Sequence, residues 1–135
     1  MKIESVEHIG IAVSDLDACI ARFEQLLGLK CEKRERVESN RVEVAVFECG
    51  GIRLELVAPT DETSPIRKFV DKGGNSLHHI CFKVEGIDEW LKFLDQQGVG
   101  LIDKVSRDGA MGHRIAFVEP KSICNFLIEL SEERP

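Results

Sequence analysis

The chain repeats itself with a period of 71 residues. At this shift the segment VEHIGIAVSDLDACIARF, which starts at residue 6, aligns with LHHICFKVEGIDEWLKFL, which starts at residue 77. Further along, RVEVAVFE aligns with GHRIAFVE at the same shift, and IRLEL aligns with FLIEL after three additional residues. A match of this length indicates two copies of one unit of roughly 65 residues, and two such long copies do not make a solenoid.

Each copy has the pattern of a strand followed by a helix and then by further strands. Strands of alternating polarity are predicted at 6–13 and 77–84, and the segment that follows each has apolar residues at helical spacing. Ser14 or Asp15 is expected to cap the first helix. The remaining strands are predicted at about 30–36, 41–48 and 52–58 in the first copy, and at about 100–105, 113–119 and 125–131 in the second.

A short helix and a hinge are expected between the two copies. The segment SPIRKFV predicts the helix, with Ser64 as its cap and Pro65 in its first position, and DKGGNS is read as the hinge. We therefore predict one α+β domain of residues 1–135, built from two tandem βαβββ modules at 1–70 and 77–135.

Four polar side chains are predicted to point away from the strand faces that pack on the helices. Apolar residues alternate along a half-buried strand, so the side chains between them turn to the opposite face. The four residues are His8 and Glu55 in the first copy and His79 and Glu129 in the second. Because the repeat places the same residue types at equivalent positions, a two-fold relation between the copies would bring all four together.

Two imidazoles and two carboxylates suit a divalent metal and leave positions for substrate or water. A single strand histidine is more often a hydrogen-bonded core or surface residue, and a single strand glutamate is more often solvated. The duplication favours ligands over these readings. We predict a metal-binding cleft, surrounded by a curved mixed sheet of the two modules, with His8, Glu55, His79 and Glu129 as ligands.

Composition excludes several other functions. The net charge of −6 argues against nucleic acid as a partner. The chain has no apolar run near the length of a membrane span and no basic-then-apolar leader, so no membrane association is expected. Its five scattered cysteines form no CxxC pair, which argues against disulfides and structural zinc and favours the cytoplasm.

These motifs resemble those of the vicinal oxygen chelate superfamily of glyoxalases, bleomycin-resistance proteins and dioxygenases, and within it those of the methylmalonyl-CoA epimerases. The resemblance covers nearly the whole chain and rests on HIGIAV, LELVAPT followed by DETSPIRKFV, LHHICFKV, GHRIAF, PKS and the final LIEL. It implies metal ligation by His8, His79 and Glu129, with Glu55 at a fourth ligand position that holds Gln or Glu in the family. The segment EPKSICNFLIEL departs from the family pattern beside Glu129, which bears on the substrate more than on the metal.

The resemblance implies an isomerase that interconverts (2R)- and (2S)-methylmalonyl-CoA by removing the C2 proton and passing through a metal-stabilised enolate. Because a proton must return on the opposite side, acid/base groups are needed on both sides, and Glu43 and Glu129 are the candidates. Val42, Val44 and Val46 are read as the core face of their strand. This reading turns Glu43 into the same concavity as the ligands, whereas an exposed strand glutamate is the alternative.

Two further residues and the expected partners follow from the same motifs. Arg114 is the repeat mate of Glu43 and is expected to bind a substrate carboxylate or a CoA phosphate, with a solvated edge arginine as the alternative. His78 is expected to face the helix side and to pack or hydrogen-bond there. The implied cofactor is a divalent Co, Mn, Ni or Zn ion, and the implied partner is an acyl-CoA. Exposed sheet edges favour a homodimer.

Three other functions within the superfamily compete with the epimerase. Lactoylglutathione lyase (glyoxalase I) shares a similar metal set and a proton shuttle, but its usual AYGHIA-like and DPDGY signatures are absent. Metal-free drug-binding resistance proteins need a hydrophobic or aromatic groove and no ligand set, whereas this chain has no Tyr, one Trp and all four ligand positions filled. Ring-cleaving dioxygenases use two histidines and one carboxylate on iron, so Glu55 argues against them.

Overall fold

The structure, a computed structural model, describes residues 1–134. These residues divide into two compact units. The N-terminal unit is His8–His78, and the C-terminal unit combines Met1–Glu7 with the chain from His79 onward. Strand β1 (Ile3–Ala12) begins in the C-terminal unit and continues into the N-terminal one. The predicted modules follow the sequence repeat and the units follow packing, so the two divisions differ, most clearly at Met1–Glu7.

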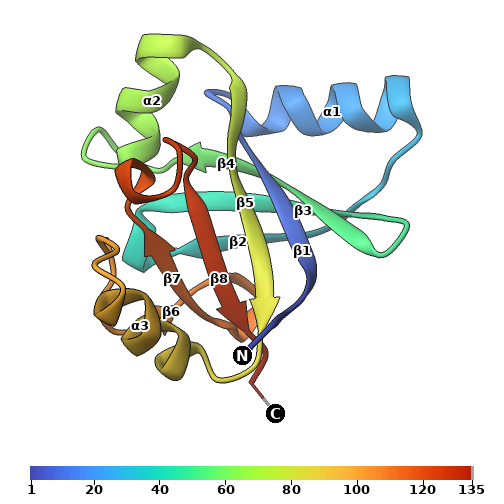
Figure 1. Ribbon diagram of the computed structural model, residues 1–135. Helices are drawn as coiled ribbons and strands as arrows, with labels where there is room; N and C mark the ends of the chain where they lie inside the picture. The colour runs from blue at the N-terminus through green and yellow to red at the C-terminus, as the bar shows by residue number, and fades with distance from the viewer. Residues whose placement is uncertain (135) are drawn as a thin grey trace. The chain divides into compact units, whose positions relative to one another are not determined.

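The N-terminal unit has four strands in the order β2-β3-β4-β1. Strand β1 pairs with β4 in parallel, and the remaining neighbours are antiparallel. Helix α1 lies against β3 and β4 (Figure 1). The elements after β1 are α1 (Leu16–Leu27), β2 (Cys31–Val37), the 3-10 turn η1 (Glu38–Asn40), β3 (Val42–Cys49), β4 (Ile52–Pro59) and α2 (Pro65–Gly73).

Helix α1 forms where the 3.6-residue pattern meets a good cap. The carboxylate of Asp15 accepts a hydrogen bond from the Ala18 amide at 3.1 Å, so Asp15 is the cap of the two candidates. Such a cap contributes about 1 kcal/mol. The buried face of the helix, with Leu16 and Ile20, packs on Phe47 and Leu56 of the sheet in the core of this unit.

The predicted helix between the copies is confirmed as α2. The hydroxyl of Ser64 accepts from the Ile66 amide at 3.2 Å, and proline occupies the first turn, where its missing N–H leaves no bond unmade. The predicted hinge is wrong at residues 71–73, which belong to α2, and at Ser76, which begins strand β5. Gly74, at φ 73, ends the helix and donates from its amide to the Val70 carbonyl at 2.8 Å.

The C-terminal unit repeats this arrangement, with strands in the order β5-β8-β7-β6, although residues 76–78 of β5 belong to the N-terminal unit. Strand β5 pairs with β8 in parallel, and the other neighbours are antiparallel. Helix α3 lies against β7 and β8 (Figure 1). The elements are β5 (Ser76–Val84), α3 (Ile87–Gln96), β6 (Arg107–Asp108), the 3-10 turn η2 (Ala110–Gly112), β7 (Arg114–Val118), the 3-10 turn η3 (Pro120–Ser122) and β8 (Ile128–Glu132).

Helix α3 takes its cap from a neighbouring strand. Gly86 precedes the helix and has no side chain to cap it, but the carboxylate of Glu132 accepts from the amides of Gly86 at 2.5 Å and Ile87 at 3.2 Å. A carboxylate at this end also meets the positive end of the helix dipole. The core of the unit contains Ile87, Leu91 and Leu130, and Trp90 packs against it.

Two predicted strands of the second copy are misplaced. At 100–105 the structure has only a single bridge, from Leu101 to Val118. The amides of Ile102 and Asp103 both donate to the Phe117 carbonyl, and the Asp103 carboxylate accepts from the Phe117 amide, so a regular ladder cannot form there. The strand predicted at 125–131 begins only at Ile128.

The late start of β8 has a backbone cause. Cys124 and Asn125 adopt left-handed conformations, at φ 50 and 68, which end any extended path before the strand. Phe126, just before the strand, is 65% exposed. The α+β class and the two βαβββ modules are nevertheless confirmed, because β5, α3, β6, β7 and β8 follow one another in that order. None of the helices within residues 1–134 has the length and apolar character that crossing a membrane requires.

Candidate metal-binding and catalytic residues

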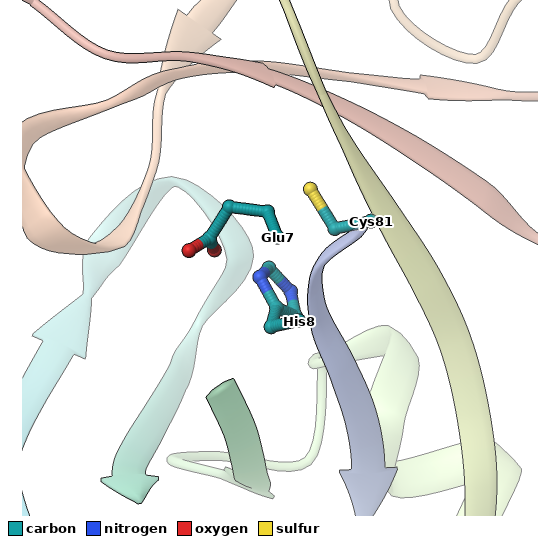
Figure 2. Close-up of side chains that lie close together, drawn as sticks. All are labelled: Glu7, His8 and Cys81. Atoms are coloured by element: carbon teal, nitrogen blue, oxygen red, sulfur yellow. The ribbon is translucent and has the colours of Figure 1, made fainter. Parts of the chain in front are cut away.

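The N-terminal unit holds one buried histidine–glutamate pair. His8 of β1 and Glu55 of β4 approach to 3.3 Å between Nδ1 and Oε2, and their side chains are 5% and 6% exposed. Gly10 is the parallel partner of Glu55, so His8 lies one strand step away, on the same face. Leu54 and Leu56 point the other way, into the core with α1. Figure 2 labels His8, the preceding residue Glu7 of β1, and Cys81 of β5.

The C-terminal unit holds an equivalent pair. His79 of β5 and Glu129 of β8 approach to 3.0 Å between Nε2 and Oε1, and both side chains are 6% exposed. Cys81 is the parallel partner of Glu129, and Phe117 is its antiparallel partner on β7. The Phe117 ring meets the His79 ring edge to face, at 5.6 Å between centroids. The imidazole is therefore held by a carboxylate and by an aromatic ring.

The strand registers show that the two pairs are built in the same way. In each unit the residue two positions after the histidine pairs with the glutamate: Gly10 with Glu55, and Cys81 with Glu129. The neighbouring antiparallel strand also matches, since Val46 pairs with Glu55 as Phe117 pairs with Glu129. The predicted direction of all four side chains, away from the helices, is confirmed in each unit. Their role as metal ligands stays a prediction.

The chemistry of the four side chains fits a divalent metal. His8, His79 and Glu129 are buried donors of kinds that could hold a metal ion, and Glu55 is 5% exposed. A buried carboxylate is costly unless it is paired, and in each unit an imidazole is its partner. Nitrogen and oxygen donors in this combination suit Zn, Co, Ni or Mn. The residues present therefore fit the ion that the sequence pattern implies.

The predicted direction of Glu43 is wrong. On β3, Ala45 and Phe47 pack with α1, and Glu43 lies two residues before Ala45, on the same face of the strand. Its partner across the sheet is Ala58, which belongs to the same core. The carboxylate of Glu43 pairs with Arg34 at 3.2 Å and is 28% exposed, on the helix-bearing face rather than on that of Glu55.

Both faces of β3 are apolar, which is why alternation failed there. Val42, Val44 and Val46 are as deeply buried as Ala45 and Phe47. A strand buried on both sides reads as a continuous apolar run, so the pattern does not say which face meets the helix. The acid/base role of Glu43 is not tested by this geometry and stays a prediction.

Arg114 is engaged within the protein. It alternates with Ile115 on β7, shares the face of Ala116, and so faces α3. Its guanidinium donates to Asp108 at 2.9 Å and to both the hydroxyl and the carbonyl of Ser106. Arg114 thus connects β7 to β6 and to the residue before it. The expected role of Arg114 in substrate binding stays a prediction.

The sequence pattern predicts the packing of His78 but does not indicate Phe117 or Arg107. His78 packs edge to face on Phe69 of α2 at 4.7 Å, which confirms its packing role. Phe117 and Arg107 were missed. The repeat could have revealed Phe117, because the shift of 71 residues places it on Val46, the neighbour of Glu55. Nothing pointed to Arg107, because its strand was predicted several residues too early.

A family model described as Glyoxalase/Bleomycin resistance protein/Dioxygenase superfamily matches residues 7–117. The chain belongs to this superfamily. The predicted resemblance is thereby confirmed, and the duplicated βαβββ order matches the fold that it implied.

Individual relatives within the superfamily include several epimerases. The chain is 40% identical over 129 residues to uncharacterized protein YqjC of Bacillus subtilis, covering 96% of this chain and 92% of that one. It is 30% identical over 132 residues to ethylmalonyl-CoA/methylmalonyl-CoA epimerase of Cereibacter sphaeroides, covering 96% and 98%. A solved methylmalonyl-CoA epimerase in complex with methylmalonyl-CoA and NH4+ matches with a TM-score of 0.93 and 31% identity, covering 98% of this chain and 96% of that one.

Proposed function

We propose that this chain is a metal-dependent methylmalonyl-CoA epimerase, an isomerase of the racemase and epimerase type. The observation that supports this best is the duplicated, buried His–Glu pair with the same strand register in each unit. The named epimerase relatives and the solved epimerase bound to methylmalonyl-CoA support the choice of reaction and of an acyl-CoA substrate.

One divalent ion per chain is proposed, held by His8, Glu55, His79 and Glu129. Each imidazole offers one nitrogen and each carboxylate one oxygen. The summed charge of −2 on the two carboxylates balances the +2 charge of the ion. When bound, a Co, Mn, Ni or Zn ion supplies Lewis-acid stabilisation of negative charge on substrate oxygens. The low exposure of all four side chains keeps water away from the ligands and strengthens the electrostatic interaction within each His–Glu pair.

The protein's own part in the reaction is to move the C2 proton of the substrate. The C2 carbon lies between a thioester and a carboxylate. Its proton must leave on one side of C2, and a proton must return on the other. We propose Glu129 and Glu43 as the two acid/base groups. For Glu129 the support is its burial beside His79, and for Glu43 it is the family resemblance alone, since its side chain lies on the helix-bearing face.

Hydrogen exchange at C2 tests this function. Metal-loaded protein is incubated in D₂O with one epimer of methylmalonyl-CoA, and deuterium at C2 is followed by mass spectrometry. We expect the wild-type chain to incorporate deuterium and His79→Ala to lose that activity. His113→Ala is the matched control, because His113 is a histidine of the same unit that takes no part in either pair.

Two results would contradict the proposal. Turnover of the methylglyoxal–glutathione adduct without C2 exchange would replace the epimerase with a glyoxalase I. Binding of neither metal nor acyl-CoA would favour a metal-free binding protein of the same fold. The expectations of a homodimer, of a cytoplasmic location and of substrate binding by Arg114 remain predictions beside this proposal.

A further inference from the structure

We propose that Arg107 binds the free carboxylate of the acyl-CoA substrate beside the His79–Glu129 pair. This inference rests on the proposed function, and Arg107 is not among the residues that the sequence pattern predicts for the site. All the residues on which it depends lie within the C-terminal unit.

The register places Arg107 on the same face as the buried pair. Arg107 of β6 is the antiparallel partner of Ile115 on β7. Partners across an antiparallel ladder point to the same side, and residues two apart on a strand do so as well, so Arg107 shares a face with Phe117. Phe117 in turn is the partner of Glu129. Arg107, Phe117 and Glu129 therefore lie on the same face of three adjacent strands, with Arg107 diagonal to Phe117 and Phe117 directly across from Glu129.

Two contacts hold the guanidinium over this row. Its Nε donates to the Asp103 carboxylate at 2.8 Å, and that carboxylate, 14% exposed, also accepts from the Phe117 amide at 2.9 Å. The guanidinium carbon lies 5.6 Å from the centroid of the Phe117 ring, in a cation–π contact. The ring of His79 meets the same aromatic ring at 5.6 Å. One phenylalanine therefore contacts both the cation and the proposed ligand.

The negative charge of Glu129 on this face favours a cation beside a bound substrate carboxylate. A substrate carboxylate brought to Glu129 meets a carboxylate, and like charges repel unless a cation or metal lies between them. A guanidinium matches a carboxylate in shape and donates from several N–H groups in a fixed plane. Arg114 lies on the opposite, helix-bearing face, where it donates to Ser106 and Asp108.

Binding rather than turnover tests the inference. Affinities of methylmalonyl-CoA and propionyl-CoA are measured by titration calorimetry with the metal-loaded wild-type chain and with Arg107→Gln. The two compounds share the thioester and the CoA phosphates and differ in the free carboxylate. We expect Arg107→Gln to bind methylmalonyl-CoA about 10- to 100-fold more weakly, as for the loss of a hydrogen bond between charged groups. Its affinity for propionyl-CoA is expected to stay within about twofold.

Two further variants make the result specific. Arg67→Gln removes an arginine that is 25% exposed and paired with an aspartate four residues away, as Arg107 is, but on helix α2. It is expected to bind both compounds like the wild-type chain. Arg107→Lys keeps the charge and should lose a smaller part of the methylmalonyl-CoA affinity. If Arg107→Gln unfolds below the assay temperature, Arg107→Lys replaces it in the comparison of methylmalonyl-CoA with propionyl-CoA affinity.

Equal weakening of both compounds would assign Arg107 to the CoA phosphates and overturn the inference. Unchanged affinity for methylmalonyl-CoA would also overturn it. In either case the C2 exchange of the wild-type chain would still support the epimerase. A wild-type chain that binds neither compound would contradict the proposed function and, with it, the role of Arg107.

Discussion

Replacing Glu129 by glutamine separates the role of this residue as a ligand from its role in folding. Glutamine has nearly the same shape as glutamate and still accepts a hydrogen bond, but it has no charge for a cation. The pair it disturbs is short, at 3.0 Å, and both side chains are 6% exposed, so water cannot replace the lost interaction. We therefore expect a small change in the metal-free protein and a large change in its response to metal.

The magnitudes follow from these contacts. Without metal, exchanging a charge-assisted hydrogen bond for a neutral one lowers the free energy of unfolding by about 1 kcal/mol. With metal at one hundred times the wild-type Kd, binding stabilises the wild-type fold by about 2.7 kcal/mol. Loss of even an outer partner of a metal ligand weakens metal binding by up to about 100-fold. A weakening of that size reduces the stabilisation at the same metal concentration to about 0.4 kcal/mol.

Thermal melting with and without added Zn²⁺ or Co²⁺ measures this difference. For a chain of this size we expect the metal to raise the Tm of the wild-type protein by about 10 °C and that of Glu129→Gln by about 2 °C. Glu48→Gln is the control, since Glu48 forms a surface ion pair with Arg53 at 3.1 Å and is 43% exposed. The reasoning is refuted if metal raises the Tm of Glu129→Gln as much as that of the wild-type chain.

Other substitutions probe the catalytic groups and the core. Glu43→Gln is expected to slow C2 exchange by about 100-fold or more while the metal-induced rise in Tm stays intact, and unchanged exchange would remove Glu43 from the mechanism. Phe47→Ala, at a fully buried ring, should lower the free energy of unfolding by about 3–5 kcal/mol in urea titrations; a loss below 1 kcal/mol would contradict the described core. Burial, and then the charge of Asp15, raise the pKa of the Cys19 thiol. Because only the thiolate reacts, Cys19 should be alkylated more slowly than exposed Cys49 at pH 8, and equal rates measured by peptide mass spectrometry would contradict this.

The duplicated part of the fold and the four candidate ligands could be predicted because the repeat supplied a second reading of each position. The predicted direction of the His8 and His79 side chains, away from the helices, is confirmed. It could be predicted because the strand around each histidine has one clearly apolar face. The same reasoning failed for Glu43, where β3 is buried on both faces and alternation carries no direction.

Long-range contacts account for the rest. The strand predicted at 100–105 is replaced by turns because the Asp103 carboxylate takes the Phe117 amide, a contact between residues 14 positions apart. This displacement moves the edge strand to Arg107, where the local sequence has no strand pattern. Neither Arg107 nor its contact with Phe117 could be found without knowing which strands pair.

The number of metal ions per chain tests the central claim most directly. Purified protein is loaded with Zn²⁺ or Co²⁺, freed of excess metal and measured by plasma mass spectrometry, together with His8→Ala and His79→Ala. If the two pairs form one site, the wild-type chain holds one ion and either substitution removes nearly all of it. Two ions per wild-type chain, with each variant keeping about one, would show independent sites and contradict the account.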